Sequence, residues 1–338
     1  MEISDILHIL FDGKALSEET TSAAIGAIMD GQYSPVQIAA LLTALRCKGE
    51  AVSEIVGAAK AMRRYAIPIR TQRRGLIDTC GTGGDRSGSF NISTTSAFIV
   101  AAAGVPVAKH GNRSATSQCG SIDLLEQLGV NVMLEPEQIG ACLDELGIGV
   151  LFARVVHPAM KYAAPVRSEL GFRTIFNFLG PLTNPALPEY QLVGISDASR
   201  LDMFAQSLQL LGLRRAWVAS ASDGLDEITL TGSTQIRQVT PDEIQSFDIS
   251  PEEIGLSLCS PGDLKGGSLE ENAVIARAIL GGKERGPKRD ITLLNAGAAL
   301  TVAEKTSSIQ EGIELAAHCI DSGKAAAVLD QLAQYSNQ

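Results

Sequence analysis

The sequence has few aromatic residues, which make up 4% of 338 residues and include one tryptophan. A buried core must therefore be built mainly from Ala, Leu, Ile and Val, and the hydrophobic content of 45% is that of an ordinary globular protein. Basic residues are also in deficit, because 28 Lys and Arg stand against 38 Asp and Glu, a net charge of −10. This balance indicates no nucleic-acid partner, although it does not exclude a local basic patch. Any anionic ligand must be held by a local arrangement or through a metal ion.

Two further absences concern metal sites and membranes. None of the six cysteines forms a Cys-x-x-Cys pair, so neither a zinc ribbon nor a redox dithiol is indicated. Scattered cysteines are typical of reduced thiols in a cytosolic protein. No apolar run reaches the roughly 20 residues that a membrane span needs, and the opening MEISDILHIL lacks the basic region of a signal peptide. We therefore expect a cytoplasmic protein with no membrane partner.

The first part of the chain, residues 1–73, is predicted to be a small helical domain. Ser17 followed by two acids, and the capping box at Ser34-Pro35-Val36-Gln37, both predict helix starts. Ser53 is predicted to cap a third helix, and no stretch alternates as a strand does. The helices have more apolar positions than so small a layer can cover, which predicts a homodimer interface here; they are Ile6, Ile9, Leu10, Ile38, Leu41, Leu42 and Leu45.

The second part, residues 74–338, is predicted to be a larger α/β domain. Strand and helix patterns alternate here, which is typical of a mostly parallel central sheet with helices on both faces. The predicted strands are 76–78, 105–108, 130–134, 148–152, 191–195 and 216–219, with helices at 93–103, 122–128, from 136, and at 201–211. The Gly- and Pro-rich segment from about 158 to 188 is predicted to cross between the two domains.

A glycine-rich loop follows the first of these strands and reads Asp78-Thr79-Cys80-Gly81-Thr82-Gly83-Gly84-Asp85. Such a loop lets backbone N–H groups approach an oxyanion, and the helix after it adds a favourable dipole. Ser89, Asn91, Ser93 and Thr94 supply neutral partners for phosphate oxygens. The loop is neither a Walker A motif nor a GxGxxG fingerprint. A plain glycine turn with a Ser/Thr cap is the alternative interpretation.

A second loop, Lys109-His110-Gly111-Asn112-Arg113-Ser114, follows the next strand and continues to Ser121. In an open parallel sheet ligands bind at the carboxyl ends of the strands, where both loops emerge. Lys109 and Arg113 bring positive charge, and arginine suits forked contacts with phosphate. The alternatives are a solvated pair of charges and a histidine with a structural role.

Two more features are weak when each is taken alone. Asp226 and Glu227, in Gly224-Leu225-Asp226-Glu227, can converge on Mg²⁺, which takes one or two carboxylates, waters and substrate phosphates. An acidic pair in a loop is more often simply solvated. Arg167 precedes a Gly/Pro-rich turn and is a candidate fork for a carboxylate, although a surface arginine is the commoner case.

Together these segments resemble the anthranilate phosphoribosyltransferase family. The family motifs GTGGD, N-x-S-T, KHGNR, RTIFN with LGPLTNP, and GLDE stand in this order at 81–85, 91–94, 109–113, 173–185 and 224–227. The resemblance implies a helical N-terminal domain and a larger α/β domain, with the active site in the cleft between them. It also implies a homodimer of tryptophan biosynthesis that uses Mg²⁺ and joins anthranilate to the ribose of phosphoribosyl pyrophosphate, releasing pyrophosphate.

The resemblance also implies the site residues. Ser93, Asp226 and Glu227 would bind Mg²⁺, while Gly81, Asn112 and Arg167 would contact anthranilate. Phosphoribosyl pyrophosphate would be held by Gly81, Gly84, Asp85, Ser89, Asn91, Ile92, Ser93, Thr94, Lys109, His110, Gly111, Asn112, Arg113, Ser114, Ala115, Thr116, Ser117 and Ser121. No residue is assigned as acid or base, because the anthranilate amine is already neutral. Catalysis would come from placing the substrates and stabilising the leaving group.

Two departures from the family pattern stand out. Ser220-Ala221 replaces the usual His-Gly before GLDE, which puts fine geometry beside the acidic pair in doubt, and Ser89 replaces a common threonine. A pyrimidine nucleoside phosphorylase shares the architecture but has a different second loop. A nucleic-acid-binding relative without activity should be basic around its cleft and lack the acidic pair, whereas this chain is acidic and keeps it.

Overall fold

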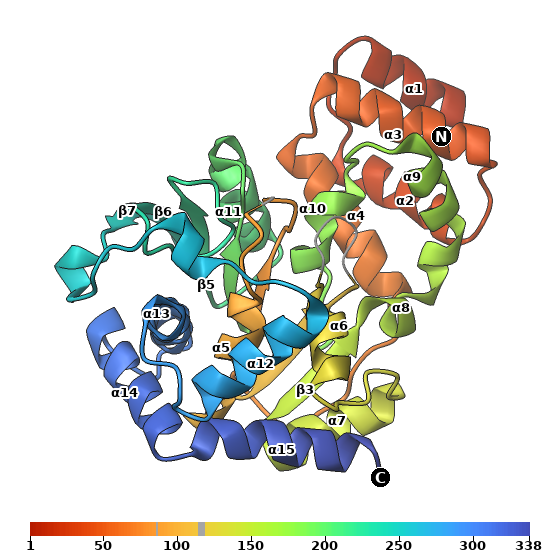
Figure 1. Ribbon diagram of the computed structural model, residues 1–338. Coiled ribbons are helices and arrows are strands. Elements are labelled where there is room, and N and C mark those ends of the chain that lie inside the picture. Colours follow the sequence, from red (N-terminus) through yellow and green to blue (C-terminus); the bar gives the residue numbers. More distant parts are fainter. Residues whose placement is uncertain (86, 114–118) are drawn as a thin grey trace.

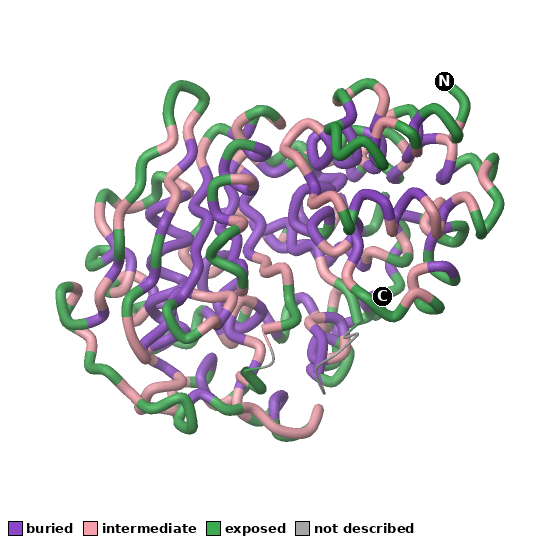
Figure 2. Tube along the Cα trace, turned by 90° about the horizontal axis from the view of Figure 1, so that it is seen from above, coloured by how far each residue is buried: buried purple, intermediate pink, exposed green. Residues whose placement is uncertain are grey.

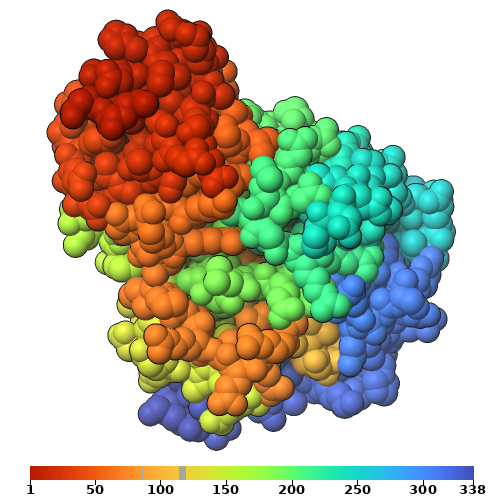
Figure 3. Space-filling model, turned by 180° about the vertical axis from the view of Figure 1, so that it is seen from behind, coloured from red at the N-terminus to blue at the C-terminus, as the bar shows by residue number. Residues whose placement is uncertain are grey.

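The computed structural model describes residues 1–85, 87–113 and 119–338. Helices α1 (Ile3–Phe11), α2 (Glu18–Met29), α3 (Pro35–Lys48) and α4 (Val52–Tyr65) form a lobe at one end of the molecule (Figure 1). Seen from behind, this lobe stands apart from the body and meets it along one side (Figure 3). The predicted helical N-terminal domain is confirmed.

The starts of these helices show which capping predictions hold. The Ser17 hydroxyl accepts the Thr20 N–H, and Ser34 and Gln37 form the reciprocal capping box that the sequence predicted. The prediction that Ser53 is a cap is wrong. Helix α4 begins after Ala51, whose N–H donates to Glu54. The Ser53 hydroxyl instead donates to the Leu16 carbonyl, which ties α4 to the preceding turn.

The body contains a seven-stranded sheet in the order β3-β2-β1-β4-β5-β6-β7. Its strands are β1 (Ile77–Gly81), β2 (Val107–Gly111), β3 (Ile148–Phe152), β4 (Tyr190–Gly194), β5 (Arg215–Ala221), β6 (Thr234–Val239) and β7 (Ile244–Ile249). Strands β1 to β5 are parallel, whereas β6 and β7 add an antiparallel hairpin at one edge. The predicted mostly parallel α/β sheet is confirmed, and the hairpin was missed.

One predicted strand, 130–134, is wrong. Val130, Val132 and Leu134 are buried and the residues between them are exposed, so the alternation in the sequence is real. The segment nevertheless joins no strand. The N–H of Asn131 donates to Ser336 instead, in the last helix, α15 (Lys324–Ser336). Alternating burial therefore occurs here in an extended segment that pairs with no strand.

Alternate residues of the central strands face two different cores. Leu192 and Trp217 belong to the core beneath the C-terminal helices, whereas Val193 and Val218 belong to the core shared with the N-terminal lobe. The first face is covered by α5 (Ile92–Ala102), α12 (Leu269–Leu280), α13 (Pro287–Val302), α14 (Ile309–Asp321) and α15; at the sheet's β3 edge lie α6 (Ser121–Gln127) and α7 (Pro136–Leu146). Helix α11 (Leu201–Leu210) covers the second face and packs on α4.

The segment after β3 returns toward the lobe. It contains α8 (Ala153–Val156), η1 (Pro158–Tyr162), α9 (Ala164–Leu170), α10 (Phe176–Leu179) and η2 (Gly180–Leu182). Its apolar side chains join the core of the N-terminal helices, and α9 packs on α3. In Figure 2 the buried stretches gather in the interior of the lobe and of the body that holds the sheet. Within the described ranges, no helix is long and apolar enough to cross a membrane.

Candidate active site

The acidic pair lies over the carboxyl ends of two adjacent strands. Gly81 of β1 is paired with Gly194 of β4 in the parallel register. A side chain at Gly81 would overlap the Asp226 carboxylate, and one at Gly194 would overlap the Asp226 carbonyl oxygen. Both glycines are therefore required for the acidic loop to reach the edge of the sheet.

The two carboxylates accept hydrogen bonds from the two elements predicted to bind phosphate. Asp226 Oδ2 accepts the Gly83 N–H of the glycine loop at 2.7 Å. Glu227 Oε1 accepts the Ser93 N–H at 3.1 Å, in the first turn of α5. The structure thus brings Gly81, Ser93, Asp226 and Glu227 together, although Glu227 lies 134 residues from Ser93 in sequence.

Burial concentrates negative charge at this point. Desolvation, with the Asp85 charge next in effect, raises the pKa of Asp226 to about 6. Desolvation and the neighbouring Asp226 raise the pKa of Glu227 to about 8, and the Lys109 charge opposes this shift. Among the residues that the structure describes, the buried Asp85 Oδ2 has no hydrogen-bond partner. These carboxylates fit a divalent cation, which would relieve their repulsion.

The protein alone does not enclose such an ion. Among the residues that the structure describes, no group of three or more His, Cys, Asp and Glu side chains is arranged to hold a metal. Mg²⁺ usually keeps waters and binds through one or two carboxylates plus substrate phosphates. The acidic pair therefore suits an ion that arrives with a phosphorylated substrate.

The raised pKa of Glu227 predicts an unusual pH dependence of stability without metal. Above pH 4.5, its ordinary pKa, and below about 8, the folded protein keeps a proton that the unfolded chain has released. The free energy of unfolding should therefore fall as pH rises through this window. Glu227→Gln should make the free energy of unfolding depend less on pH. At pH 8 in EDTA the melting temperature of this variant should exceed that of the wild type, by roughly 2 °C per kcal/mol of stability gained. Calorimetry at pH 5 and 8 checks this, with the exposed Glu314→Gln as control; an equal or lower melting temperature would contradict it.

Lys109 extends the site into the interior of the sheet. Its side chain lies on β2 with 3% exposure, and Nζ donates to the Thr79 carbonyl at 2.7 Å. Burial lowers its pKa, and the Asp78 charge opposes that shift. Asp78 is itself buried, which raises its pKa to about 6, and it accepts hydrogen bonds from Asn184 Nδ2 and the His110 N–H. Asn184 thus links the returning segment to the strands that carry the two loops.

His110 contacts protein groups. Its Nδ1 lies 3.1 Å from the Gly180 carbonyl, and its ring centroid lies 5.1 Å from that of His157. Burial lowers the pKa of His110 to about 4 and that of His157 to about 3. Both rings are therefore neutral at pH 7, which favours a role in shaping the site over a role in binding anions.

The second loop is only partly described. Ser114, Ala115, Thr116 and Ser117 lie outside the described residues. The Arg113 guanidinium donates to Asp123 at 2.7 Å and to Glu126 at 2.8 Å and lies over the Phe152 ring. The Ser121 hydroxyl donates to the Asn112 carbonyl at 3.3 Å, in space that a side chain at Gly111 would fill. Arg113 is thus held by α6 in this structure.

The remaining predicted contacts lie at the start of α5. Asn91 Nδ2 donates to the Cys119 carbonyl at 3.1 Å and so joins the two loops. Its buried Oδ1 has no hydrogen-bond partner within the described part of the chain. Ser89 forms an isolated bridge with Lys265. Ile92 and Thr94 are buried in the first turn of the helix. An amide oxygen without a partner at this junction marks it as a place for a ligand donor.

Arg173 was missed as a site residue, although it opens the RTIFN motif. Its Nη1 donates to the Gly83 carbonyl at 3.3 Å and lies against Gly84. Its charge also lowers the pKa of Asp226. The glycine loop is therefore held at Gly83 by two hydrogen bonds, one from its N–H to Asp226 and one from Arg173 to its carbonyl.

Arg167 lies apart from this cluster, on α9. Its guanidinium carbon is 5.3 Å from the centroid of the Phe176 ring, and burial lowers its pKa. In the described part of the chain, no hydrogen bond or ion pair joins Arg167 to Asn112. With respect to the described residues, its guanidinium makes no hydrogen bond or ion pair, which leaves its donors available to a ligand that reaches α9.

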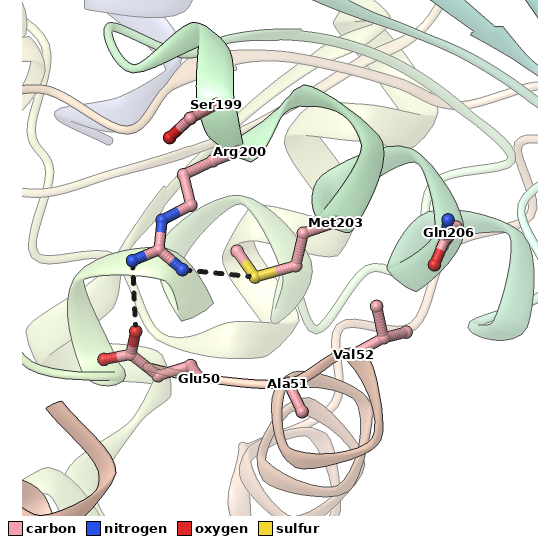
Figure 4. A pocket seen from close by; sticks show the side chains of 7 residues that line it. All are labelled: Glu50, Ala51, Val52, Ser199, Arg200, Met203 and Gln206. Carbon is pink, nitrogen blue, oxygen red and sulfur yellow. Dashed lines mark hydrogen bonds and ion pairs between the residues drawn. The ribbon is translucent and has the colours of Figure 1, made fainter. Parts of the chain in front are cut away.

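A hollow of about 460 Å³ lies between the start of α4 and the start of α11 (Figure 4). It is lined by Glu50, Ala51, Val52, Ser199, Arg200, Met203 and Gln206. Arg200 crosses to Glu50, where Nη2 and Oε2 are 3.5 Å apart. None of the predicted site residues lines it, so we do not assign it to the active site.

Comparison with known proteins agrees with this geometry. Residues 4–66 match the model of the glycosyl transferase family helical bundle domain, and residues 73–326 match that of its a/b domain. Anthranilate phosphoribosyltransferase of Rubrobacter xylanophilus is 51% identical over 326 residues, which cover 96% of this chain and 95% of that protein. The chain belongs to the anthranilate phosphoribosyltransferase family.

Solved structures of anthranilate phosphoribosyltransferases are similar over their whole length. The enzyme from Thermus thermophilus has a TM-score of 0.93 at 44% identity and covers 98% of this chain and 99% of its own. The enzyme from Saccharomyces cerevisiae, solved in complex with PRPP and Mg, has a TM-score of 0.91. The match covers 99% of this chain and 98% of the yeast chain. At 24% identity that second likeness shows the fold. As a member of this family the chain is a pentosyltransferase of tryptophan biosynthesis.

Proposed function

We propose that the chain transfers the 5-phosphoribosyl group of phosphoribosyl pyrophosphate to the amine of anthranilate, giving N-(5-phosphoribosyl)anthranilate and pyrophosphate. The observation that carries this proposal is the buried acidic pair, hydrogen-bonded to the glycine loop on one side and to the start of α5 on the other. Backbone amides at a helix start and in a glycine loop suit phosphate oxygens. The proposed division is a domain of residues 1–73, with a contribution from about 158–188, and a domain of residues 74–338.

In this proposal, phosphoribosyl pyrophosphate binds along the two loops and the first turn of α5. Lys109 supplies a buried positive charge beside Glu227. Asp226, Glu227 and Ser93 hold Mg²⁺, which the yeast relative was solved with. When bound, the ion neutralises charge on the pyrophosphate and makes it a better leaving group.

The reaction requires little proton transfer from the protein. The bond between ribose C1 and the pyrophosphate oxygen breaks, and the oxygen keeps the electron pair. The neutral amine of anthranilate forms the new C1–N bond with its lone pair and afterwards loses a proton to solvent or to the departing pyrophosphate. Burial lowers the pKa of His110 to about 4 and that of His157 to about 3, so both rings are weak bases and serve to shape the site. Holding the two substrates in line then supplies most of the rate enhancement.

An assay of pyrophosphate release tests the proposal. With phosphoribosyl pyrophosphate and Mg²⁺, release should be slow until anthranilate is added, and the fluorescence of anthranilate should then fall in step with it. A rate of pyrophosphate release that does not change when anthranilate is added would contradict anthranilate as the acceptor. Release that requires a nucleobase, or phosphorolysis of a nucleoside, would favour the phosphorylase alternative.

Arg167→Ala should mainly weaken the use of anthranilate. The half-buried Arg167 guanidinium over the Phe176 ring suits a forked pair with the carboxylate, worth roughly 1.5–3 kcal/mol. We expect a raised KM for anthranilate and a nearly unchanged KM for phosphoribosyl pyrophosphate in steady-state kinetics. Arg64→Ala, which removes another arginine stacked on an aromatic ring, is the control. Equal losses for both substrates would indicate a structural role.

The partners proposed are these two small molecules, with no nucleic acid, no membrane and a cytoplasmic location. A second copy of the chain is the one macromolecular partner proposed, but the apolar positions that predicted its interface are not exposed on the lobe. Six of the seven apolar positions behind it are buried within the chain, and Ile9 is partly buried. The lobe instead exposes Phe11 at 69% and Val36 at 78%, on α1 and α3, which pack on each other.

Light scattering at micromolar concentration should give the mass of a dimer. Phe11→Asp with Val36→Asp should give monomers, because charge would replace exposed apolar surface on the lobe. Leu258→Asp, at a residue 51% exposed in the body, should leave the dimer intact. A monomer mass for the wild type would refute the homodimer, and a dimer that survives the double substitution would place its interface elsewhere.

A further inference from the structure

Asn295, near the middle of α13, is buried with 1% exposure and points its amide at the main chain that follows the acidic pair. Its Oδ1 accepts the Ile228 N–H at 3.0 Å, and its Nδ2 donates to the Ile228 carbonyl at 2.9 Å. The second hydrogen on Nδ2 goes to the Ile291 carbonyl at 2.9 Å. Because these carbonyls only accept and the N–H only donates, the amide has one orientation. One side chain thus fixes both main-chain groups of the residue after Glu227.

The same helix also holds the opposite side of the site. Ser96 of α5 donates its hydroxyl to the Thr292 carbonyl at 3.2 Å, one turn before Asn295 on α13. Helices α5 and α13 pack along each other. The first turn of α5 carries Ser93, whose N–H donates to Glu227. Helix α13 therefore fixes, independently, the two elements that meet at the acidic pair.

A neutral clamp suits this position. Asp226 and Glu227 are adjacent, buried carboxylates, and the charge of Asp226 already raises the pKa of Glu227. The start of the loop is closed by Asp223, which accepts the Leu225 N–H at 3.0 Å and the Thr229 hydroxyl at 2.9 Å. At the far end of the loop, Asn295 of α13 holds the main chain of Ile228. An amide restrains the main chain there without adding charge to the site.

We propose that Asn295 is a positioning residue that holds the main chain at Ile228 so that Asp226 and Glu227 stay directed at the magnesium-bound pyrophosphate. This inference rests on the function proposed above. It explains why an asparagine stands in the otherwise apolar run Leu293-Leu294-Asn295-Ala296. Groups that orient metal ligands are often nearly as important as the ligands themselves.

The test is calorimetric titration of the protein with magnesium pyrophosphate, together with steady-state kinetics. Asn295→Ala should weaken binding of magnesium pyrophosphate by roughly 10–100-fold. The KM for phosphoribosyl pyrophosphate should rise while that for anthranilate stays within about twofold. Asn295→Asp keeps the shape and the acceptor for the Ile228 N–H but loses both donors, and it should show the same selective loss if the alanine variant does not fold.

The control is Thr301→Val on the same helix. Thr301 is buried, and its hydroxyl donates to the Gly297 carbonyl, away from the acidic loop. This variant should lower the melting temperature without changing the binding of magnesium pyrophosphate. Wild-type binding in Asn295→Ala, or losses of the same size in Thr301→Val, would overturn the inference. If the wild type itself fails to bind magnesium pyrophosphate, it is the proposed function that fails.

Discussion

Asp226→Ala combined with Glu227→Ala is expected to lower turnover by at least roughly 10²–10³-fold, the usual loss when a group that stabilises developing charge is removed. The two carboxylates are buried, and burial together with neighbouring carboxylates holds their pKa values above the ordinary range. Such an arrangement costs stability unless a cation is bound. The variant should therefore stay folded and melt no lower than the wild type without metal. The measurement is turnover across a Mg²⁺ titration at saturating substrates.

A matched control removes two adjacent acids elsewhere. Glu252 and Glu253 are exposed on η4 (Glu252–Ile254), and their replacement by alanine should leave turnover and its Mg²⁺ dependence unchanged. Wild-type turnover in the Asp226, Glu227 variant would show that the pair does not bind the metal. If turnover falls and high Mg²⁺ restores it fully, the pair contributes affinity alone.

Gly194→Ala is expected to have the second-largest effect. A methyl group on this residue would overlap the carbonyl oxygen of Asp226, so the acidic loop or strand β4 must move. A displacement of about 1 Å in a positioning element can cost roughly 10²-fold in rate. The loss should appear in turnover and in the KM for phosphoribosyl pyrophosphate, since the displaced carboxylate also holds the Gly83 N–H. Steady-state kinetics and thermal unfolding measure both effects.

Gly262→Ala is the control for this substitution. Its new side chain would meet its nearest neighbour, the Ser260 hydroxyl, at 3.6 Å, an ordinary contact. Gly262→Ala should leave the turnover rate and the melting temperature close to those of the wild type. If Gly194→Ala keeps wild-type kinetics, the acidic loop does not depend on its close contact with β4.

Most of the fold could be predicted from the sequence because local patterns matched their surroundings. The apolar run at Ile148–Phe152 became β3 without a change of boundary, and the capping box at Ser34 began α3 as expected. The segment 130–134 shows the limit. Its alternation reported burial of one face correctly, but strand formation also needs a partner, which a single sequence does not display.

The site was predictable in its motifs and not in its contacts. GTGGD and GLDE identified the glycine loop and the acidic pair, whose residues meet across more than 130 positions of sequence. Gly194 and Asn295 lie outside the motifs that were given roles. Their importance depends on which main-chain atoms lie within reach, at Asp226 and at Ile228, and that is a property of the folded chain. Arg173 stood in a recognised motif, but only the structure shows that it holds Gly83.

The central claim is that Asp226, Glu227 and the first turn of α5 form the place where magnesium and pyrophosphate are held. A crystal structure of the chain with Mg²⁺ and phosphoribosyl pyrophosphate tests it most directly. The account predicts an ion in contact with at least one carboxylate of the pair and with pyrophosphate oxygens, and phosphate oxygens hydrogen-bonded to the Gly81–Asp85 loop or to the start of α5. Pyrophosphate bound at another edge of the sheet, with Asp226 and Glu227 touching neither it nor the ion, would contradict the account.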